Sequence, residues 1–432
     1  MTHQPASLHA LIRYAWIAIP AAFAGFPLYV LAPDFYAARA YLSLTQLGFV
    51  LLLIRLGDAV LDPVIGLYLD RMQTRLRGPV IGAALVLGLA VFGLFNLVLG
   101  PPLLWFSVCI CLAIAAHSVL IISLAVRATL WSQDPHQQTR IAALRESFGL
   151  IGLVAATSAP TVLSALIPAE QVYGAYSGLL GLLLVIGVMC FSSLPTPVSA
   201  SSPSTSASSA EAFTFFALWS SLPPQRARLM LVYGLSMLAS SLPAVLVIFY
   251  IRDLLHAADW TGAFLMIYFL TGALATPLWS AISRRIGPYE SWAVAHLLAV
   301  ATFIGAFFLQ TGDALAYAVI CALSGLALGA DLTLPPALLA NQLHQTQAPH
   351  LSGRHYALLS FLAKASLALA SALALPLLDL AGFKPQSANQ PDALLALSAA
   401  YALIPCLFKL IAAMLLYHFF IRPNAGEHNE SH

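Results

Sequence analysis

Apolar segments about 20 residues long recur along the whole chain and constrain its fold more than any other feature. Only 8% of the 432 residues are charged, whereas a soluble domain has about 25%. Because a bilayer core needs roughly 20 apolar residues per helix, the sequence predicts an all-α integral membrane protein. The twelve expected spans are residues 11–32, 44–69, 79–99, 103–131, 141–167, 172–194, 227–251, 260–283, 290–310, 313–341, 355–380 and 393–421.

A serine- and proline-rich stretch divides these spans into two sets of six. The sequence SSLPTPVSASSPSTSASSAE, from Ser192 to Glu211, has no apolar periodicity and predicts a flexible linker. The expected organisation is an N-terminal half at residues 1–194, a linker at 195–225, a C-terminal half at 226–422 and a tail at 423–432.

The basic residues predict the orientation in the membrane. Eleven arginines fall at one set of loops and chain ends, whereas Arg39, Arg252 and Lys384 fall at the other set. Basic loops face the cytoplasm, so we expect both termini and the linker inside, in a bacterial inner membrane. The net charge of +2 is too small to indicate nucleic-acid binding. The five cysteines lie in apolar segments and predict neither a disulfide framework nor a metal site.

Charges lie inside the second apolar span, in the sequence IRLGDAVLDPVIGLYLDR. In a helix, Arg55, Asp58 and Asp62 fall within about 60° of one another and share one face. A charge at the centre of a membrane helix costs roughly 2.5–3.5 kcal/mol on insertion scales, and such residues are usually functional. Two interpretations remain: a structural ion-pair network, or a coupling site at which a proton or Na⁺ completes the charge balance. We favour the coupling site.

A weak internal repeat relates the two halves. DPVIGLYLDRMQTRLRGP closes the second span and TPLWSAISRRIGP closes the eighth; each has a proline, a basic loop and then Gly-Pro. This organisation resembles the major facilitator transporters, in which two six-helix halves related by pseudo-two-fold symmetry enclose a substrate site near the midplane. GLYLDR resembles their G-x-x-x-D-R loop signature. The resemblance implies that Gly66, Asp70 and Arg71 form a gating loop.

Four stretches resemble the glycoside–pentoside–hexuronide:cation symporters, the melibiose-permease type. RLGDAVLDPVIGLYLDR is similar to their second helix, and TRIAALRESFGLIG to the start of their fifth. LGADLTLPPALLANQ, followed by SGRHYALLSFLAKASLALA, is similar to their helices ten and eleven. The resemblance implies that Asp58 and Asp62 bind the coupling cation, and that Arg145 and Lys364 line a central cavity.

The sequence departs from the sugar-transporting members where they bind sugar. Those members carry carboxylates in helices one and four, whereas residues 1–32 and 103–133 contain no acid here. ANQLHQ also stands in place of their A-D-x-x-D-Y. The cavity is therefore expected to be cationic and to take a small polar or anionic solute rather than a sugar.

Two further membrane residues have competing interpretations. His117 falls near the position of a hydroxyl ligand in sodium-using relatives; it is either a proton shuttle of the coupling site or a hydrogen-bonded core histidine. Asp331 precedes Pro335 and Pro336, which are expected to break or kink their helix. Asp331 either belongs to the substrate cavity with Arg55, Arg145 and Lys364, or forms a structural pair at a hinge, with Lys364 as candidate partner.

The predicted function is secondary active transport by alternating access, as a monomer without a resident cofactor, coupled to H⁺ or Na⁺. His117 favours the proton. Two alternatives stay open: a lipid or amphiphile carrier of the same fold, and a non-transporting sensor or assembly protein. No nucleophile elbow, zinc-protease or Walker motif is present in the sequence, so neither an enzyme nor ATP-driven transport is expected.

Overall fold

The computed structural model describes residues 8–26, 28, 31–32, 35–36, 44–132, 134–194, 222–384 and 389–423, and every regular element within these ranges is a helix. Among the described residues, 11 helices are long and apolar enough to cross a membrane. Each lies at one of the expected spans, which confirms the all-α membrane fold. Helix α4 (Leu44–Arg71) occupies the remaining expected position and is not one of these 11.

The chain folds into two compact units, each described here by itself. Unit 1 comprises the described residues of Met1–Ser221 together with Ala340–Leu358. Unit 2 comprises Leu222–Leu339 and the described residues of Leu359–His432. Unit 1 therefore contains a short segment from the second half of the sequence. The expected linker, apart from its last four residues, and the tail after residue 423 lie outside the described residues.

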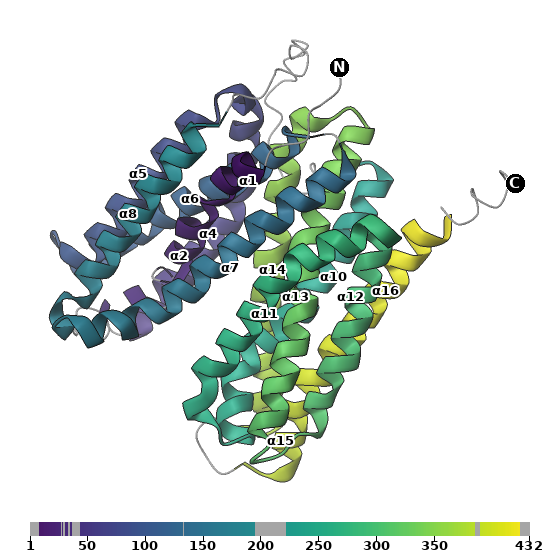
Figure 1. Cartoon of the computed structure of the whole chain (residues 1–432). Helices are drawn as coiled ribbons and strands as arrows, with labels where there is room; N and C mark the ends of the chain where they lie inside the picture. Colours follow the sequence, from purple (N-terminus) through teal and green to yellow (C-terminus); the bar gives the residue numbers. More distant parts are fainter. Residues whose placement is uncertain are drawn as a thin grey trace, which may run out of the picture. The chain divides into compact units, whose positions relative to one another are not determined.

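Seven α-helices of unit 1 come from the first half of the sequence. They are α1 (Leu8–Ala15), α2 (Ala18–Phe26), α4, α5 (Arg77–Asn96), α6 (Pro102–Thr129), α7 (Pro135–Leu166) and α8 (Val172–Ser192). Figure 1 shows α5 running beside α6 and α8, against which it packs. Helix α2 crosses α7 closely, since a Cβ added to Gly152 would lie 2.4 Å from the Ile19 carbonyl oxygen. Small residues at such crossings let the backbones of membrane helices approach.

Unit 2 is built from the remaining long helices. They are α10 (Pro224–Phe249), α11 (Thr261–Ile286), α12 (Pro288–Phe303), α13 (Ala314–Gln345), α14 (Ser352–Leu380), α15 (Pro391–Ser398) and α16 (Ile404–Leu416). Helix α16 packs against α10 and α12. Tyr250 and Tyr401 stack with their ring centroids 4.0 Å apart, which anchors the end of α10 against the segment that follows α15. The end of α13 and the start of α14 lie in the segment Ala340–Leu358 and therefore belong to unit 1, whereas the rest of both helices belongs to unit 2.

Prolines mark where helices begin and also lie inside them. Five of the described α-helices start with proline, whose missing N–H has no intrahelical partner at that position anyway. Pro335 and Pro336 lie within α13, which continues to Gln345. Of the expected break or kink, the break is therefore excluded, because a membrane helix tolerates proline where neighbouring groups satisfy the freed carbonyls.

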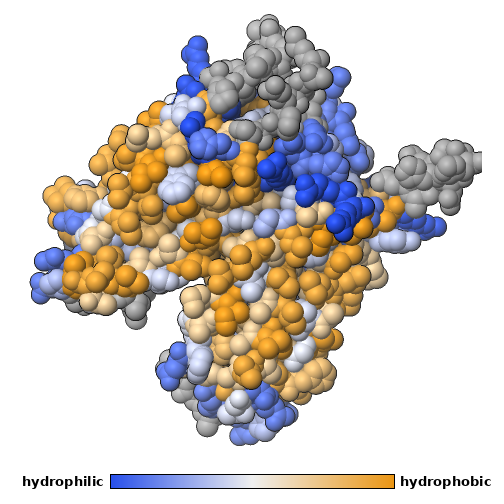
Figure 2. Space-filling model, viewed as in Figure 1, coloured by the Kyte–Doolittle hydropathy of each residue, from blue (hydrophilic) through white to orange (hydrophobic). Residues whose placement is uncertain are grey.

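The flanks of the helices carry apolar side chains. Figure 2 shows hydrophobic surface along the helices and hydrophilic residues gathered towards their ends. Leu85 and Leu89 on α5 are each 63% exposed, and Leu274 on α11 is 67% exposed. Side chains of this kind are stable when they face lipid hydrocarbon, as in an integral membrane protein.

Candidate functional site

Two buried carboxylates on α4 form the centre of the site in unit 1. Asp58 and Asp62 are 5% and 0% exposed and lie one helical turn apart on one face. Helix α4 packs against α6, and the Ser118 hydroxyl of α6 donates a hydrogen bond to Oδ1 of Asp58 at 3.1 Å. The carboxylates that the sequence singled out therefore lie inside the protein rather than facing lipid.

The neighbouring residues His117 and Ser118 have different partners. Ser118 contacts Asp58, whereas Nε2 of the half-buried His117 lies 3.1 Å from the carbonyl oxygen of Ala21 on α2. Since a carbonyl only accepts, Nε2 carries the hydrogen. The hydroxyl beside the carboxylates thus comes from position 118, which the sequence analysis missed. Its only sequence signal was a serine directly after the histidine.

These groups provide an oxygen-rich environment. Two carboxylates and a hydroxyl are ligands that hard cations prefer, and a carboxylate also accepts a proton. Among the described residues, no group of three or more histidine, cysteine, aspartate or glutamate side chains is arranged to hold a metal ion. Any metal cation bound here would therefore need hydroxyl or backbone oxygens as well. The side chain of Arg55, a predicted member of the set, lies outside the described residues.

Arg145 on α7 is paired with the residue that follows it. Its Nη2 lies 2.5 Å from Oε1 of Glu146, and its Nε lies 2.9 Å from the same oxygen. Adjacent positions of a helix point in different directions, but both side chains are long enough to bend towards each other. The pair is electrically neutral, so Arg145 does not by itself make the surroundings cationic.

Asp70, at the end of α4, binds the first turn of α14. Its carboxylate accepts hydrogen bonds from the backbone N–H of Gly353 at 2.6 Å and of Arg354 at 3.1 Å, and from Nε of Arg354 at 3.2 Å. The first N–H groups of a helix have no intrahelical acceptor and carry partial positive charge. Asp70 therefore caps α14 and pairs with Arg354. We call these contacts the latch.

The latch depends on a close crossing of α4 and α14. A Cβ added to Gly66 would lie 2.6 Å from the Gly353 carbonyl oxygen, and one added to Gly353 would lie 2.3 Å from that of Gly66. Only glycine at both positions permits this approach. Asp70 lies just beyond the expected span at 44–69, and burial raises its pKa to about 6. Arg71, the third residue of the predicted gating loop, is exposed.

Further contacts hold the segment Ala340–Leu358 in unit 1. Nε2 of Gln73 donates to the His350 carbonyl oxygen at 2.8 Å. Nε2 of His344 lies 2.6 Å from the Thr129 carbonyl oxygen, and the Thr129 hydroxyl donates to the Tyr356 hydroxyl at 2.8 Å. Both ends of the segment are therefore tied to the first half of the sequence.

A second buried charge cluster lies in unit 2. Asp331 on α13 forms an ion pair with Lys409 on α16. Its Oδ1 also accepts hydrogen bonds from the Ser236 hydroxyl at 3.0 Å and from Nε1 of Trp292 at 2.9 Å. The ion-pair partner of Asp331 is therefore Lys409, which the sequence analysis left without a role, and not Lys364, which lies on α14 of the same unit.

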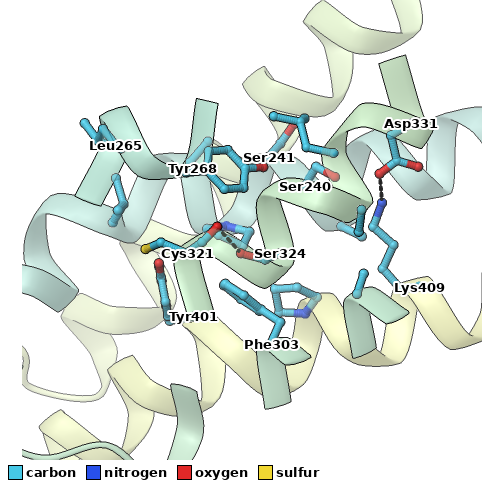
Figure 3. A pocket seen from close by; sticks show the side chains of 18 of the residues that line it. Ser240, Ser241, Leu265, Tyr268, Phe303, Cys321, Ser324, Asp331, Tyr401 and Lys409 are labelled. Atoms are coloured by element: carbon cyan, nitrogen blue, oxygen red, sulfur yellow. Dashed lines mark hydrogen bonds and ion pairs between the residues drawn. The ribbon is translucent and has the colours of Figure 1, made fainter. Parts of the chain in front are cut away.

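A cavity of about 590 Å³ adjoins this cluster. Figure 3 shows Asp331 and Lys409 at one end of the cavity, with Tyr268, Tyr401 and Phe303 among the side chains of its wall. All of its lining residues belong to unit 2.

With 11 membrane-length helices among its described residues, the protein has the all-helical fold of the major facilitator transporters. The fold resembles a bacterial homologue of the iron transporter ferroportin in an outward-facing state, with TM-score 0.67 and 15% identity over 95% of this chain and 98% of that one. It also resembles the Escherichia coli fucose:proton symporter FucP, with TM-score 0.65 and 13% identity over 94% and 98%. The human organic anion transporter MFSD10 gives TM-score 0.66 and 17% identity over 94% and 99%. These identities show the fold alone.

Residues 13–422 match the MFS/sugar transport protein family. The chain therefore belongs to this family, whose members are transporters and not enzymes, and the resemblance seen in the sequence is confirmed. A curated relative is the glucuronide carrier protein homolog of Escherichia coli strain K12, 23% identical over 176 residues. That match covers 40% of this chain and 38% of the relative's length.

Proposed function

We propose that this secondary transporter is a symporter, which couples movement of a small solute to H⁺ or Na⁺ by alternating access in a bacterial inner membrane. The observation that carries the proposal is the buried pair Asp58 and Asp62, with the Ser118 hydroxyl on Asp58. Two carboxylates one turn apart inside a membrane helix are costly to retain. A site that binds a cation during transport accounts for that cost.

Charge balance at the two carboxylates would couple cation binding to the transport of the solute. Ionised carboxylates in a low-dielectric interior favour states in which a cation or water can reach them. A bound cation removes that preference and lets the transporter exchange its two orientations once substrate is also present. In this scheme the latch at Asp70 stabilises one orientation, and its release accompanies the exchange.

The coupling ion is either H⁺ or Na⁺, and one observation bears on each. His117 was the sequence argument for a proton, and its Nε2 is hydrogen-bonded to the Ala21 carbonyl. The Ser118 hydroxyl adds an oxygen to the carboxylate pair, which favours Na⁺. We keep both ions in the proposal, and the experiment below distinguishes them.

A second candidate, an amphiphile carrier of the same fold, is favoured by one observation. The cavity of unit 2 is lined mainly by apolar and aromatic side chains, which suits a solute with a large apolar part. This candidate changes the substrate and leaves the cation site as proposed.

The test is the melting temperature of the purified protein in Na⁺ and in choline at equal ionic strength, from pH 5 to 9. The wild type is compared with Asp58→Asn and Asp62→Asn, and with Asp392→Asn as a control at an exposed acid. A ligand that binds only the folded state raises stability by about 2.7 kcal/mol at a hundred times its dissociation constant. We expect Na⁺ to stabilise the wild type and the control but neither Asp58→Asn nor Asp62→Asn; if the coupling ion is the proton, the gain in melting temperature at low pH should be smaller in these two variants than in the wild type and the control.

Proteoliposome uptake of candidate solutes then tests coupling directly. Both α4 variants should bind solute and exchange it without accumulating it against a gradient. Ion-driven accumulation that persists in both variants would show that the carboxylates are structural.

A further inference from the structure

We propose that the cavity of unit 2 is a binding site for a largely apolar solute of zero net charge, which Asp331 and Lys409 orient. The inference rests on the proposed transport function and names its substrate class. Three features of the cavity support this inference. They are its size and aromatic lining, the hydrogen bonds that several of its hydroxyl groups already make within the protein, and the zero net charge of the Asp331–Lys409 pair at one end.

The size and lining suit a compact organic molecule. The cavity holds about 590 Å³, and small-molecule sites of roughly 300–1,000 Å³ are mostly apolar with a few placed polar groups. Six aromatic side chains contribute to its wall: Phe264, Phe269, Phe303, Tyr268, Tyr317 and Tyr401. Aromatic rings bind flat or branched apolar groups because they bury a large apolar surface and make edge-to-face contacts.

Several hydroxyl groups of the wall are already engaged within the protein. The Tyr317 and Tyr401 hydroxyls hydrogen-bond each other at 2.6 Å. The Ser324 hydroxyl donates to the Ile320 carbonyl of its own helix at 2.6 Å. A sugar needs partners for many hydroxyls, and each one buried without a partner costs about 1–3 kcal/mol. Three of the six hydroxyl-bearing side chains that line the cavity are therefore engaged, which leaves few partners for the many hydroxyls of a polyol.

The charged end of the cavity is neutral as a whole. Asp331 and Lys409 pair with each other, Lys409 Nζ also donates to the Ser236 hydroxyl at 2.9 Å, and Trp292 donates to Asp331. An ionic solute would bring a charge with no counter-charge into a buried site, which is strongly unfavourable. A neutral solute with one polar group can hydrogen-bond to the pair without disturbing this balance.

The experiment uses three probes that share a benzophenone core and differ in charge, on the full chain in lipid nanodiscs. They are 4-benzoylbenzyl alcohol, 4-benzoylbenzoate and (4-benzoylbenzyl)trimethylammonium, which are neutral, anionic and cationic. Irradiation inserts the excited ketone into nearby C–H bonds, and peptide mass spectrometry then identifies the labelled residues. Met237 lines the cavity and offers reactive C–H bonds beside its sulfur.

We expect the neutral probe to label Met237 and its cavity neighbours at least about tenfold more than either ion does, as an uncompensated buried charge requires. Ser324→Leu fills the cavity and should reduce that labelling at least about fivefold. Ser371→Leu is the matched control. Its hydroxyl also bonds to its own helix, at 3.0 Å from the Leu367 carbonyl, but Ser371 does not line the cavity.

Two charge variants test the role of the pair without filling the cavity. Asp331→Asn leaves the positive charge of Lys409 and should raise labelling by the anionic probe relative to the neutral one. Lys409→Met leaves the negative charge of Asp331 and should favour the cationic probe. Circular dichroism and size-exclusion profiles identify variants that fold.

Equal labelling by all three probes in the wild type, labelling outside the cavity only, or unchanged preference in both folded charge variants would overturn the proposal. Photolabelling measures binding of the probe and requires no ion gradient. Failure here therefore leaves the cation site at Asp58 and Asp62 untouched, and failure of ion coupling leaves the cavity result standing.

Discussion

At the scale of single residues, one hydroxyl changes how the α4 carboxylates are understood. Ser118 donates to Asp58, so Asp58 is held by a neutral group that can also turn its oxygen towards a cation. The carboxylate is oriented without being neutralised by this contact. That arrangement differs from Asp331, whose contact with Lys409 neutralises it.

Ser118→Ala should weaken cation binding about 10- to 150-fold, since a lost hydrogen bond to a charged group is worth roughly 1.5–3 kcal/mol. The measurement is the Na⁺ or proton concentration that gives half of the thermal stabilisation. Ser123→Ala, at a fully buried serine on another face of α6, is the control and should keep the wild-type midpoint. Equal midpoints in both variants would remove Ser118 from the site.

The site could be predicted from sequence only where an unusual residue type marks it. Acids inside an apolar span identify themselves, so Asp58, Asp62 and Asp331 could be selected. Partners could not, because they come from other helices: Ser118 lies 60 residues from Asp58, and Lys409 lies 78 from Asp331. The pairing of Arg145 with Glu146 depends on side-chain torsions, which helical position alone does not determine.

At the scale of helices, α4 and α14 cross where each has a glycine. The first turn of α14 and the last turns of α4 approach until backbone meets backbone. That approach brings Asp70 onto the N–H groups of Gly353 and Arg354. The loop signature in the sequence predicted a gate at this position, and the geometry supplies a physical reason for its glycine.

Gly66→Ala should open this crossing, because its Cβ would lie 2.6 Å from the Gly353 carbonyl oxygen. Overpacking of this kind typically costs about 1–3 kcal/mol. Amide hydrogen exchange at Gly353 and Arg354 measures the effect, and it should become faster. Gly57→Ala is the matched control on the same helix, with no atom within 4 Å of the new Cβ. Alanine there should leave exchange unchanged, and equal rates in the two variants would contradict the crossing.

The fold was more predictable than the site, because apolar length alone determines a membrane helix. Each of the 11 apolar helices lies where a span was expected. Of the break or kink predicted at Pro335 and Pro336, the break does not occur, since a packed membrane helix tolerates proline better than a soluble one does. The place of Ala340–Leu358 in unit 1 was not predictable from periodicity, which carries no information on which elements pack together.

At the scale of the whole molecule, stability should depend on pH through Asp70. Burial raises its pKa to about 6 from an ordinary value of about 3.9. The folded protein then holds the proton more tightly than the unfolded chain does. The stabilisation is therefore fully present below about pH 4 and is lost as pH rises through about 6.

The melting temperature of the wild type should accordingly fall between pH 4 and 6.5 by more than that of Asp70→Asn. Above about pH 7 the two curves should run parallel, since Asp70 is then ionised in both folded and unfolded states. Asp392→Asn, which removes an exposed acid, should follow the wild type throughout. Parallel curves for wild type and Asp70→Asn across the whole range would contradict a raised pKa.

The continuity of α13 and α14 across the two units has a mechanical consequence. Helix α13 runs from Ala314 to Gln345 and enters unit 1 at Ala340; α14 begins in unit 1 and re-enters unit 2 after Leu358. A helix transmits push and torque far better than a loop does. Pro335 and Pro336 lie in α13 just before the boundary, where each proline removes a backbone hydrogen bond from the helix. Asp331 lies about one helical turn before Pro335, so the charged end of the cavity and the part of α13 that belongs to unit 1 are parts of one continuous helix.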